Sequence, residues 1–406
     1  MNANPDCTAA ARPRPPSLAS RILLRAFDRI EHGRLELTTP EGGRRLLAGG
    51  HSGPDGALVL RRPWRLLGRL ARRGEIGFAE GFMAGDWWSP DPATLLEVLA
   101  LNERQLAEAL PVVALDPLLG RIRHRLRPNT RRGSRRNIAA HYDLGNDFFR
   151  LWLDDTLSYS GAVFGHPEEP LAVAQARKYQ RLLDLLEARP GQHLLEIGCG
   201  WGGFALHAAR QGVRVTGITL SREQMALARS RVAEAGLEGR VSIQLVDYRD
   251  LQGRFDHIVS IEMFEAVGEP YWPTYFATLR RHLKPGGRAA VQTITIDEDA
   301  FSHYRRSADF IQLYIFPGGL LPSVTRFRSH AEAAGLHLRD RAMFGADYGR
   351  TLRHWHGAVR ARAAAIRALG YDERFLRMWR YYLAYCEAGF RTGRVDLMQA
   401  LLEAPA

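Results

Sequence analysis

The sequence predicts a doubly wound α/β fold, a mostly parallel sheet with helices on both faces, preceded by a smaller, mainly helical domain. After residue 137, short apolar strands alternate with helical segments, and the first of these strands runs into a glycine-rich turn. Before residue 127 no such alternation occurs. The length of 406 residues also exceeds what one hydrophobic core usually organises, so two domains are expected.

The elements of the larger domain follow in order. HLLEIGCGWGG (193–203) is a strand with its glycine turn, and FALHAARQ continues as a helix. VRVTGITLS (213–221) repeats the strand, and REQMALARSRVAEAG (222–236) repeats the helix. VSIQLVDYRDL, FDHIVSIEMFE and GRAAVQTITI (287–296) supply three more strands. Ligands of such sheets bind at the carboxyl ends of the strands, so the functional residues are expected there.

We expect four segments along the chain: a disordered tail (1–17), an N-terminal domain associated with lipid (18–127), a basic linker (128–136) and a larger domain that carries the chemistry (137–406). The tail is rich in Pro and Ala and lacks the apolar run of a secretory signal. The N-terminal domain contains the aromatic-rich piece GFAEGFMAGDWW and an amphipathic segment, LLEVLALN.

The charge of the chain indicates a polyanionic partner. The formal net charge is +12, and eight arginines with no acid lie between Arg121 and Arg136. This stretch is either a solvated linker or a patch that binds phosphate head groups, where each basic residue contributes about 1 kcal/mol near an anionic membrane surface. No stretch approaches the roughly 20 apolar residues that span a bilayer, so membrane contact is expected to be peripheral.

Cysteine usage fits a reducing compartment. The three cysteines, Cys7, Cys199 and Cys386, show no spacing typical of a disulfide framework or a zinc site. We therefore expect no metal and a cytoplasmic protein, bound peripherally to the inner face of the membrane.

The glycine turn is the strongest local signal. Glu196, Gly198 and Gly200 follow the pattern ExGxG, in which small residues let main-chain amides and a helix N-terminus face an anionic group. A dinucleotide site or simple tight packing would also use such a turn. The second strand, however, ends in Thr219 and Leu220, where NAD-binding proteins usually place an acid on the ribose.

The neighbouring strand ends favour S-adenosylmethionine as the ligand. Gln224 can hydrogen-bond ribose hydroxyls in place of the missing acid. The third strand ends in Asp247 and Tyr248, which can contact an adenine by hydrogen bonding and stacking. Together with the glycine turn, these residues form the predicted cofactor site.

Five segments together resemble the cyclopropane-fatty-acyl-phospholipid synthase family, which includes the mycolic acid cyclopropane synthases. They are HYDLGNDFFRLWLDDTLSYSGAVF, LLEIGCGWGG, GITLSREQ, MFEAVG and DFIQLYIFPGGLLPS, and the match runs from about residue 137 to 390. The resemblance implies a Rossmann-like class I SAM-dependent methyltransferase fold, an unsaturated phospholipid substrate and a homodimer. GFAEGFMAGDWW resembles the amino-terminal domain of the phospholipid-acting members.

The resemblance also implies a chemistry. The alkene of an acyl chain attacks the sulfonium methyl group, which leaves a carbocation, and loss of a proton from the new methyl closes a cyclopropane ring. A base must lie beside that carbon in a dry pocket, because water would trap the cation. The family resemblance assigns this role to a bound bicarbonate.

The residues implied to hold bicarbonate are Glu265 in MFEAVG, Tyr348 in FGADYGRT and the backbone of Ile294. Two positions depart from the family pattern, because its frequent His is Gln292 and its Cys is Gly161. Gln can still donate a hydrogen bond, and the Cys position contributes through its backbone. The departures leave open whether the product is a ring, a methyl branch or a methylene branch.

Four further positions carry interpretations. The resemblance implies that Tyr159 and Ser160 contact the cofactor, although Tyr159 could also be core. Cys386 matches a family cysteine, but a thiol has no step in this mechanism, so a structural role is favoured. Glu262 lies three residues before Glu265, and because alternate strand residues face opposite sides, we treat it as secondary.

The segment from Phe301 to Pro322, rich in aromatic and aliphatic residues, is either a cap over an acyl tunnel or ordinary core. Three alternative functions are a small-molecule N-methyltransferase, a nucleic-acid methyltransferase and a lipid-binding protein on an inactive methyltransferase fold. The first does not explain residues 18–127. The second lacks an NPPY-like motif and any RNA-binding module, so no nucleic-acid partner is expected. The intact glycine turn and Glu265 disfavour the third.

Overall fold

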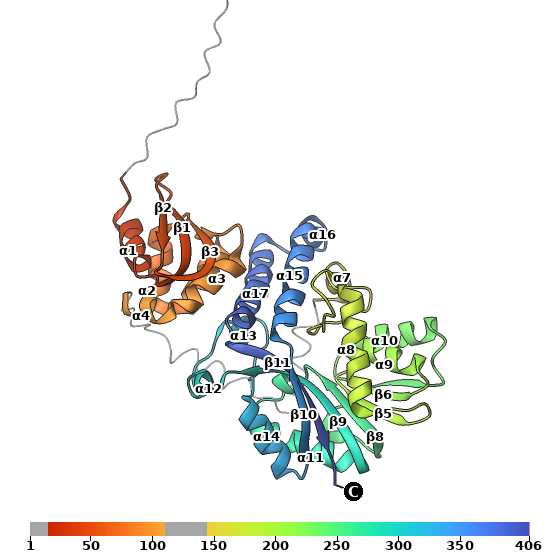
Figure 1. Cartoon of the computed structure of the whole chain (residues 1–406). Helices are drawn as coiled ribbons and strands as arrows, with labels where there is room; N and C mark the ends of the chain where they lie inside the picture. Colours follow the sequence, from red (N-terminus) through yellow and green to blue (C-terminus); the bar gives the residue numbers. More distant parts are fainter. Residues whose placement is uncertain (1–14, 110–143, 406) are drawn as a thin grey trace, which may run out of the picture. The chain divides into compact units, whose positions relative to one another are not determined.

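The structure is a computed structural model of the chain and describes residues 15–109 and 144–405 (Figure 1). The chain forms two compact units that divide between these two ranges. The tail up to residue 14, the arginine-rich stretch and the expected basic linker lie outside the described residues, so those predictions stay predictions.

The first unit combines helices with a sheet. Its helices are α1 (Leu18–Phe27), α2 (Pro63–Ala84), α3 (Pro92–Leu101) and α4 (Glu103–Ala109). Its strands are β1 (His32–Thr38), β2 (Arg44–Ala48), β3 (His51–Leu60) and β4 (Trp87–Trp88), in the order β2-β1-β3-β4. Helices make up most of its regular structure, as expected, but the sheet was not anticipated. The Gly and Pro residues in the first half of β3 hide the strand pattern.

The aromatic-rich piece of the first unit forms part of its core. Trp87 is almost completely buried, its ring stacks on Phe78, and its Nε1 donates a hydrogen bond of 2.8 Å to the Phe78 carbonyl. Asp86 is also buried and pairs with Arg69 over 2.8 Å. A Cβ at Gly81 would lie 3.1 Å from the Trp87 ring, so a glycine allows this approach. The motif therefore packs the unit together.

The second unit contains a seven-stranded sheet in the order β10-β11-β9-β8-β5-β6-β7. Five strands are parallel, namely β5 (His193–Ile197), β6 (Arg214–Thr219), β7 (Val241–Leu245), β8 (Phe255–Ile261) and β9 (Leu283–Ile296). Strand β11 (Val395–Glu403) runs antiparallel to β9, and β10 (His337–Met343) pairs antiparallel with β11, so β10 runs in the same direction as the parallel strands. Strand order reverses beside β5, which confirms the Rossmann-like prediction.

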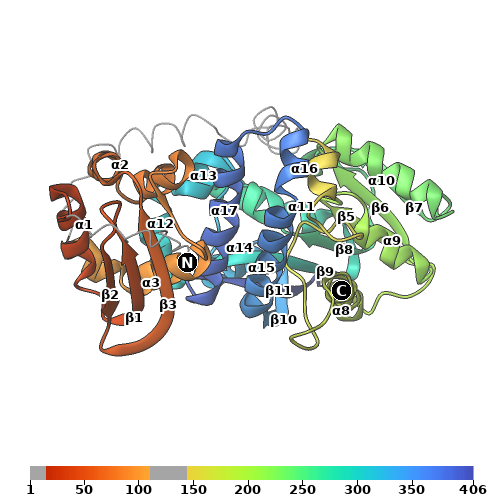
Figure 2. The same ribbon diagram turned by 90° about the horizontal axis from the view of Figure 1, so that it is seen from above.

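Helices cover both faces of this sheet (Figures 1 and 2). One buried cluster joins it to α8 (Leu171–Leu186), α9 (Gly203–Arg210) and α10 (Arg222–Glu234). A second cluster joins the opposite face to α11 (Trp272–His282) and α14 (Val324–Ala333). Each helix contributes an apolar stripe of buried residues, as a doubly wound sheet requires.

The remaining elements lie around the carboxyl ends of the parallel strands or at the edges of the unit. The helices are α7 (Asn146–Arg150), α12 (Glu298–Tyr304), α13 (Phe310–Tyr314), α15 (Gly345–Ala361), α16 (Ala363–Ala368) and α17 (Glu373–Arg391). Three short 3₁₀ turns are η1 (Tyr248–Asp250), η2 (Phe264–Ala266) and η3 (Glu269–Tyr271). Helices α15 and α17 pack side by side. Among the described helices, none is long and apolar enough to cross a bilayer.

Candidate active site

The glycine turn after β5 has the predicted strand-turn-helix geometry. The N–H groups of Gly198 and Cys199 both donate to the Ile218 carbonyl at 3.0 Å. Gly198 and Gly200 have φ values of +82° and +51°, in the left-handed region that glycine adopts at little cost. Helix α9 begins at Gly203, directly after the turn. The turn therefore presents backbone amides and a helix N-terminus at the carboxyl edge of the sheet.

Glu196 ends β5 as a buried acid. Its side chain is almost fully enclosed, and Oε2 has no hydrogen-bond partner within the described parts of the chain. Burial raises the pKa of this carboxyl to about 8, against the opposing charge of Lys178. A buried acid whose oxygen lacks a hydrogen-bond partner can accept a hydrogen bond from a cationic ligand group, such as the ammonium of the SAM methionine moiety.

The second strand end orients Gln224. Thr219 Oγ1 donates to Gln224 Oε1 at 2.8 Å, and Ser221 caps α10 by accepting from the Gln224 N–H. Leu220 lies between them and is partly buried. Because Thr219 engages the carbonyl oxygen, the amide NH₂ of Gln224 is the group that would reach a ribose hydroxyl.

Asp247 and Tyr248 follow β7 as expected, with a partner that the sequence analysis missed. Arg249 donates to both oxygens of Asp247, at 2.8 Å from Nε and 2.7 Å from Nη2. Its guanidinium also lies 5.4 Å from the Tyr248 ring centroid. Burial raises the pKa of Tyr248 to about 12. Arg249 therefore fixes the carboxylate that was expected to contact the adenine.

Tyr159 and Ser160 are oriented by protein partners. The Tyr159 hydroxyl lies 2.8 Å from that of Tyr382, and its ring packs against Trp152 and Trp355. Lys178 Nζ donates to Ser160 Oγ at 2.6 Å. Tyr159 thus belongs to an aromatic cluster, and the Ser160 hydroxyl accepts from a buried ammonium.

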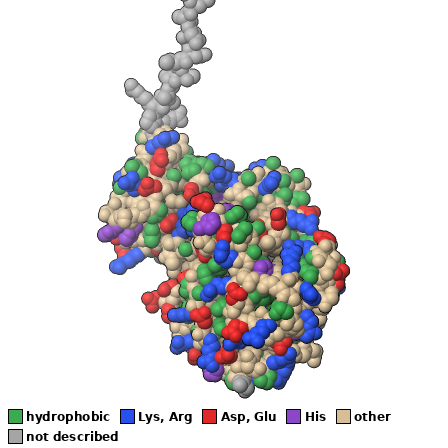
Figure 3. Space-filling view, turned by 45° about the vertical axis from the view of Figure 1, so that its right-hand side comes forward, with side chains coloured by type: hydrophobic (Ala, Val, Ile, Leu, Met, Phe, Trp, Pro, Cys, Tyr) green, Lys and Arg blue, Asp and Glu red, His purple; other side chains and the backbone are tan. Residues whose placement is uncertain are grey.

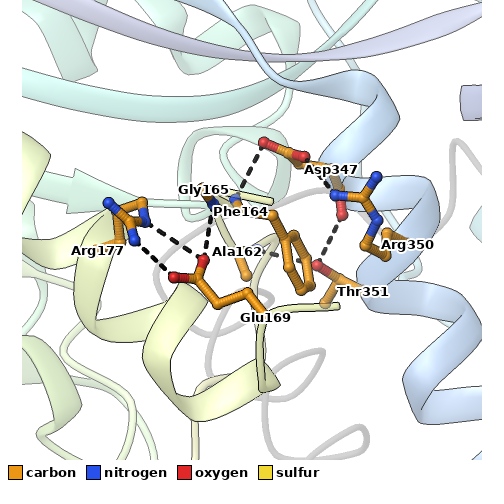
Figure 4. A network of polar contacts seen from close by, with 8 residues as sticks. All are labelled: Ala162, Phe164, Gly165, Glu169, Arg177, Asp347, Arg350 and Thr351. Carbon is orange, nitrogen blue, oxygen red and sulfur yellow. Dashed lines mark hydrogen bonds and ion pairs between the residues drawn. The ribbon is translucent and has the colours of Figure 1, made fainter. Parts of the chain in front are cut away.

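The segment that follows Ser160 is held by hydrogen bonds from its backbone (Figure 4). The N–H of Ala162 donates to Thr351 Oγ1 at 3.1 Å, and that of Phe164 to Asp347 Oδ2 at 3.2 Å. Both acceptors lie on α15, so the segment is fixed to this helix. Arg350 supports the arrangement, with its guanidinium 4.9 Å from the Phe164 ring centroid.

The same segment is anchored to α8 on its other side (Figure 4). The Gly165 N–H donates to Glu169 Oε2 at 2.7 Å, and Arg177 pairs with Glu169 over 2.5 Å. The hydrogen bond from Arg177 lowers the pKa of Glu169 to about 2, so this anchor stays charged over the working pH range. The backbone around Gly161 is therefore held in one position.

The N–H of Gly161 donates to the carboxylate of Glu262. Glu262 Oε1 accepts from Gly161 N and from Gln292 Nε2, both at 2.8 Å. Its Oε2 accepts from the Tyr348 hydroxyl at 2.5 Å. Gln292 also donates to the Gly161 carbonyl at 3.0 Å and accepts from Gln399 at 2.8 Å, which fixes the orientation of its amide.

This arrangement corrects the expectation that Gln292 and Tyr348 act with Glu265 and that Glu262 is secondary. Strand β8 ends at Ile261, and Glu262 has a φ of +49°. The alternation of faces that guided the expectation ends with the strand, so it does not apply to Glu262. The turn directs this side chain toward Gln292 and Tyr348.

Glu265 occupies a separate position close by. Its Oε1 accepts from the Ile294 N–H at 2.5 Å, so the expected backbone contact of Ile294 is present. Its Oε2 is buried and has no hydrogen-bond partner in residues 15–109 and 144–405. The two carboxyl groups are electrostatically coupled, and the charge of Glu262 opposes ionisation of Glu265.

The electrostatics divide the roles of the two acids. Burial raises the pKa of Glu262, while the hydrogen bonds from Tyr348 and Gln292 and the charge of Lys178 oppose this rise. Burial, followed by the charge of Glu262, raises the pKa of Glu265 to about 8. Three hydrogen-bond donors point at Glu262 and use it as an acceptor only, as an ionised carboxylate is, whereas Glu265 with its raised pKa holds a proton near neutral pH.

Gly161 is required by close packing. A Cβ at this position would lie 2.7 Å from Leu397 Cδ2 and 2.8 Å from the Tyr348 ring. A cysteine, as the family pattern has it, would displace Tyr348 from Glu262. The two departures noted in the sequence, Gly161 and Gln292, thus both serve the Glu262 carboxylate.

The residues present do not fit a bound bicarbonate. Of the donors that the resemblance assigned to it, the Gly161 N–H, the Gln292 amide and the Tyr348 hydroxyl donate to Glu262. The remaining donor, the Ile294 N–H, donates to Glu265. A second anion would also meet the charge of Glu262 directly. A carboxylate of the chain itself takes the hydrogen bonds that bicarbonate would need.

Cys386 on α17 is a free thiol. Burial raises its pKa well above the ordinary value, so the thiolate is disfavoured. This supports the structural interpretation of Cys386 over a catalytic one.

The segment from Phe301 to Pro322 lies directly against the carboxylate turn. The Leu320 N–H donates to the Glu265 carbonyl at 2.9 Å. Phe310 is buried, with its ring 4.8 Å from that of Tyr381, and Phe316 packs on Tyr382. An apolar, aromatic layer therefore lies beside the two acids, at the place expected of a cap.

Besides Arg249, two residues of the site were misjudged from sequence, because Lys178 was not named and Glu262 was treated as secondary. Lys178 is completely buried, and burial lowers its pKa to about 8 against the opposing charges of Glu262 and Glu196. Its spacing of four from Ala174 and Leu182, which are also buried, places it on the inner stripe of α8 and could have revealed it. Glu262 is the second, and its sequence neighbourhood gives no comparable signal.

Comparisons with known proteins agree with this geometry. The family model of the mycolic acid cyclopropane synthetases matches residues 129–400. The chain belongs to this family. It is a SAM-dependent methyltransferase, as the family match and the similarity to cyclopropane synthases, one of them solved with SAH, indicate.

Its relatives include cyclopropane synthases and fatty acid methyltransferases. The chain is 42% identical to tuberculostearic acid methyltransferase UfaA1 of Mycobacterium tuberculosis, over 94% of this chain and 90% of that protein. It is 38% identical to cyclopropane-fatty-acyl-phospholipid synthase of Escherichia coli, over 82% of this chain and 84% of that protein. The solved structure of mycolic acid cyclopropane synthase CmaA1, complexed with SAH and CTAB, matches with a TM-score of 0.63 and 32% identity over 66% of this chain and 98% of its own.

Proposed function

We propose that this methyltransferase adds the methyl group of SAM to a double-bond carbon of an unsaturated fatty acyl chain in a phospholipid. One observation carries the proposal. A buried, hydrogen-bonded carboxylate lies next to the SAM-type glycine turn and beneath an aromatic, apolar segment. Such a site suits a substrate that has no polar group of its own at the reacting carbon.

The apolar surroundings serve two steps. The double bond supplies its electron pair to the methyl carbon, and the electron pair of the broken sulfur–carbon bond stays on sulfur. A carbocation results on the acyl chain, and aromatic faces such as those of Tyr159 and Tyr382 can stabilise it. Exclusion of water by residues such as Phe310 and Leu320 protects the cation until a proton leaves.

The direct test is lipid analysis. Expression in a bacterium that makes monounsaturated phospholipids but no cyclopropane or methyl-branched lipids should convert part of the monounsaturated fatty acid methyl esters to species heavier by one CH₂ group in mass spectrometry. If the lipids are unchanged although the protein purified from the same cells binds SAM, the proposed acceptor is contradicted and a small-molecule substrate is favoured.

A methylene-branched product is the second candidate, favoured by the 42% identity to a fatty acid methyltransferase along nearly the whole chain. Ring closure and methylene formation both add one CH₂ and release one proton. Proton NMR of the isolated ester separates them, because a cyclopropane gives upfield ring signals and a methylene gives vinylic ones. A gain of one CH₂ plus two hydrogens would indicate that a separate hydride donor in the cell has saturated the branch.

We further propose that the arginines between Arg121 and Arg136, which lie outside the described residues, bind anionic phospholipid on the cytoplasmic face of the membrane. On the face shown in Figure 3, basic and acidic side chains are interspersed, whereas these eight arginines stand together without an acid. Replacing four of them with Gln should weaken binding to anionic vesicles in a salt-sensitive manner. Unaltered vesicle binding would remove this assignment.

A further inference from the structure

Glu262 is held in a backbone conformation that a glutamate rarely adopts. Its φ of +49° lies in the left-handed region, which costs a non-glycine residue roughly 1 kcal/mol or more. A glycine would adopt it freely. Three hydrogen bonds to the Glu262 carboxylate offset this backbone strain, from Gly161, Gln292 and Tyr348.

The three donors come from separate parts of the unit. Gly161 lies in the segment that Figure 4 shows fixed to α8 and α15, Gln292 is in β9, and Tyr348 is in α15. Each donor is itself fixed: Gly161 by its neighbours' hydrogen bonds, Gln292 by Gln399, and Tyr348 by its ring against Phe390 at 4.5 Å. The site is therefore built to hold one carboxylate in one orientation.

The carboxylate turn also lies against the glycine turn of the predicted cofactor site. A Cβ placed on Gly198 would come within 3.1 Å of the side chain of Met263, the residue next to Glu262. The glycine turn and the carboxylate turn therefore touch. Lys178 links them electrostatically, since its charge acts on both Glu196 and Glu262.

We propose that the Glu262 carboxylate is the base that removes the proton from the methylated acyl chain, and that it replaces an external anion such as bicarbonate. The inference rests on the proposed function and names the group that completes it. A carboxylate of the chain fills the place where a free anion would otherwise be bound.

The step balances without a further reactant. After the methyl carbon has bonded to the chain, one of its C–H bonds breaks, and the electron pair of that bond closes the ring onto the neighbouring cationic carbon. For the methylene product, a hydride first moves from the methylated carbon to that cationic carbon, and the electron pair of the methyl C–H bond then forms the double bond. The proton goes to a Glu262 oxygen. The acid formed then passes the proton to solvent before the next turnover.

Glu265 is not the group that fulfils this role. Burial, followed by the nearby Glu262, raises the pKa of Glu265 to about 8, so it holds a proton near neutral pH, and the Ile294 N–H donates to one of its oxygens. A protonated carboxylic acid cannot accept the proton. Glu265 is instead a positioning residue, which joins the carboxylate turn to β9 and, through its carbonyl, to Leu320.

The test is to remove the carboxylate and offer a free one. Glu262→Gly relieves the backbone strain and leaves the three donors without the carboxylate that accepts from them. Turnover in bicarbonate-free buffer should fall about 100-fold or more, as for loss of a general base. Bicarbonate or formate should then restore part of it in a saturable manner. The unsubstituted enzyme should show no response to either anion.

Two variants control this experiment. Glu262→Gln fills the same space without a base, so it should be as inactive as Glu262→Gly and unresponsive to added anions. Glu187→Gly replaces another glutamate at positive φ, +51°, whose exposed side chain lies at the C-terminus of α8. It should behave like the unsubstituted enzyme in turnover. Should Glu262→Gly fail to fold, loss of turnover with retained SAM affinity in Glu262→Gln tests the base.

A binding measurement is independent of turnover. ¹³C-labelled bicarbonate should give a saturable bound signal in NMR with Glu262→Gly and none with the unsubstituted enzyme. Bicarbonate dependence of the unsubstituted enzyme, full activity of Glu262→Gly without an anion, or failure of every small anion to rescue it would overturn the inference. If the unsubstituted enzyme methylates no acyl chain at all, the proposed function fails instead.

Discussion

Two turns at the same edge of the sheet, one after β5 and one after β8, present their polar groups in opposite ways. The first turn presents backbone N–H groups. Its glycines are close together in the sequence and have the positive φ values that the turn requires. The second uses a side chain, whose donors lie 101, 30 and 86 residues away, at Gly161, Gln292 and Tyr348. A turn built from backbone can be recognised in its own residues, whereas a carboxylate site depends on what the fold brings to it.

The largest effect should come from breaking the backbone turn. Gly198→Val places a branched side chain at φ +82° and within contact of Met263, so SAM binding should become unmeasurable by calorimetry. Gly236→Ala is the control. Gly236 also has a positive φ, +65°, but a Cβ there meets nothing within 4 Å, so SAM affinity should be unchanged. Retained binding in Gly198→Val would contradict the cofactor assignment.

Substitutions in the carboxylate turn should lower turnover while leaving SAM affinity nearly unchanged. Glu262→Gln should lower kcat by about 100-fold or more, and Glu265→Gln by about 10-fold, with SAM affinity within about twofold in both. The difference follows from the three donors that hold Glu262 as a carboxylate, whereas Glu265 accepts from one backbone N–H. Steady-state kinetics and calorimetry on the same preparations check this. A larger loss from Glu265→Gln would reverse the two roles.

Tyr348→Phe removes a single donor and should have an intermediate effect. A hydrogen bond to a charged group contributes about 1.5–3 kcal/mol, and a loss of about 2 kcal/mol lowers turnover about 30-fold. Loss of the donor destabilises the carboxylate and raises the pKa of Glu262 further. The acid limb of the pH profile of kcat should therefore move to higher pH. A profile that does not move would show that Tyr348 does not act through Glu262.

The smallest effect concerns stability. The pKa of Glu265 is raised to about 8, so between the ordinary carboxyl value of 4.5 and about 8 the folded state binds a proton that the unfolded state has lost. Stability from this group is present below that range and is lost as pH rises through it. Glu265→Gln should flatten the decline in melting temperature from pH 5 to 8, by roughly 2–4 °C for each kcal/mol of this linked stability that is removed. An unchanged slope would contradict the buried, proton-bound state.

The alternation of strands and helices, together with the glycine turn, predicted the fold of the second unit. The same reasoning missed the sheet of the first unit, because Gly53, Pro54 and Gly56 interrupt the pattern of β3. The apolar periodicity and the turn residues were sufficient to predict the strands and helices where the sequence pattern was uninterrupted.

The candidate active site was predicted only in part. Gly161, Gln292, Tyr348 and Ile294 were all placed in it, but the acid that joins three of them was taken to be Glu265. The strand pattern ends one residue before Glu262, and a positive φ at a glutamate has no sequence signature. Only the fold reveals which of two acids three residues apart faces the donors.

The most direct test of the account follows the methyl hydrogens. The enzyme should be given SAM with a fully deuterated methyl group and a monounsaturated phospholipid, and the product analysed by mass spectrometry. Transfer to the double bond followed by proton loss to Glu262 predicts that the product keeps two of the three deuterons. Retention of all three would mean that the methyl group stayed intact on another acceptor, and the account would be contradicted.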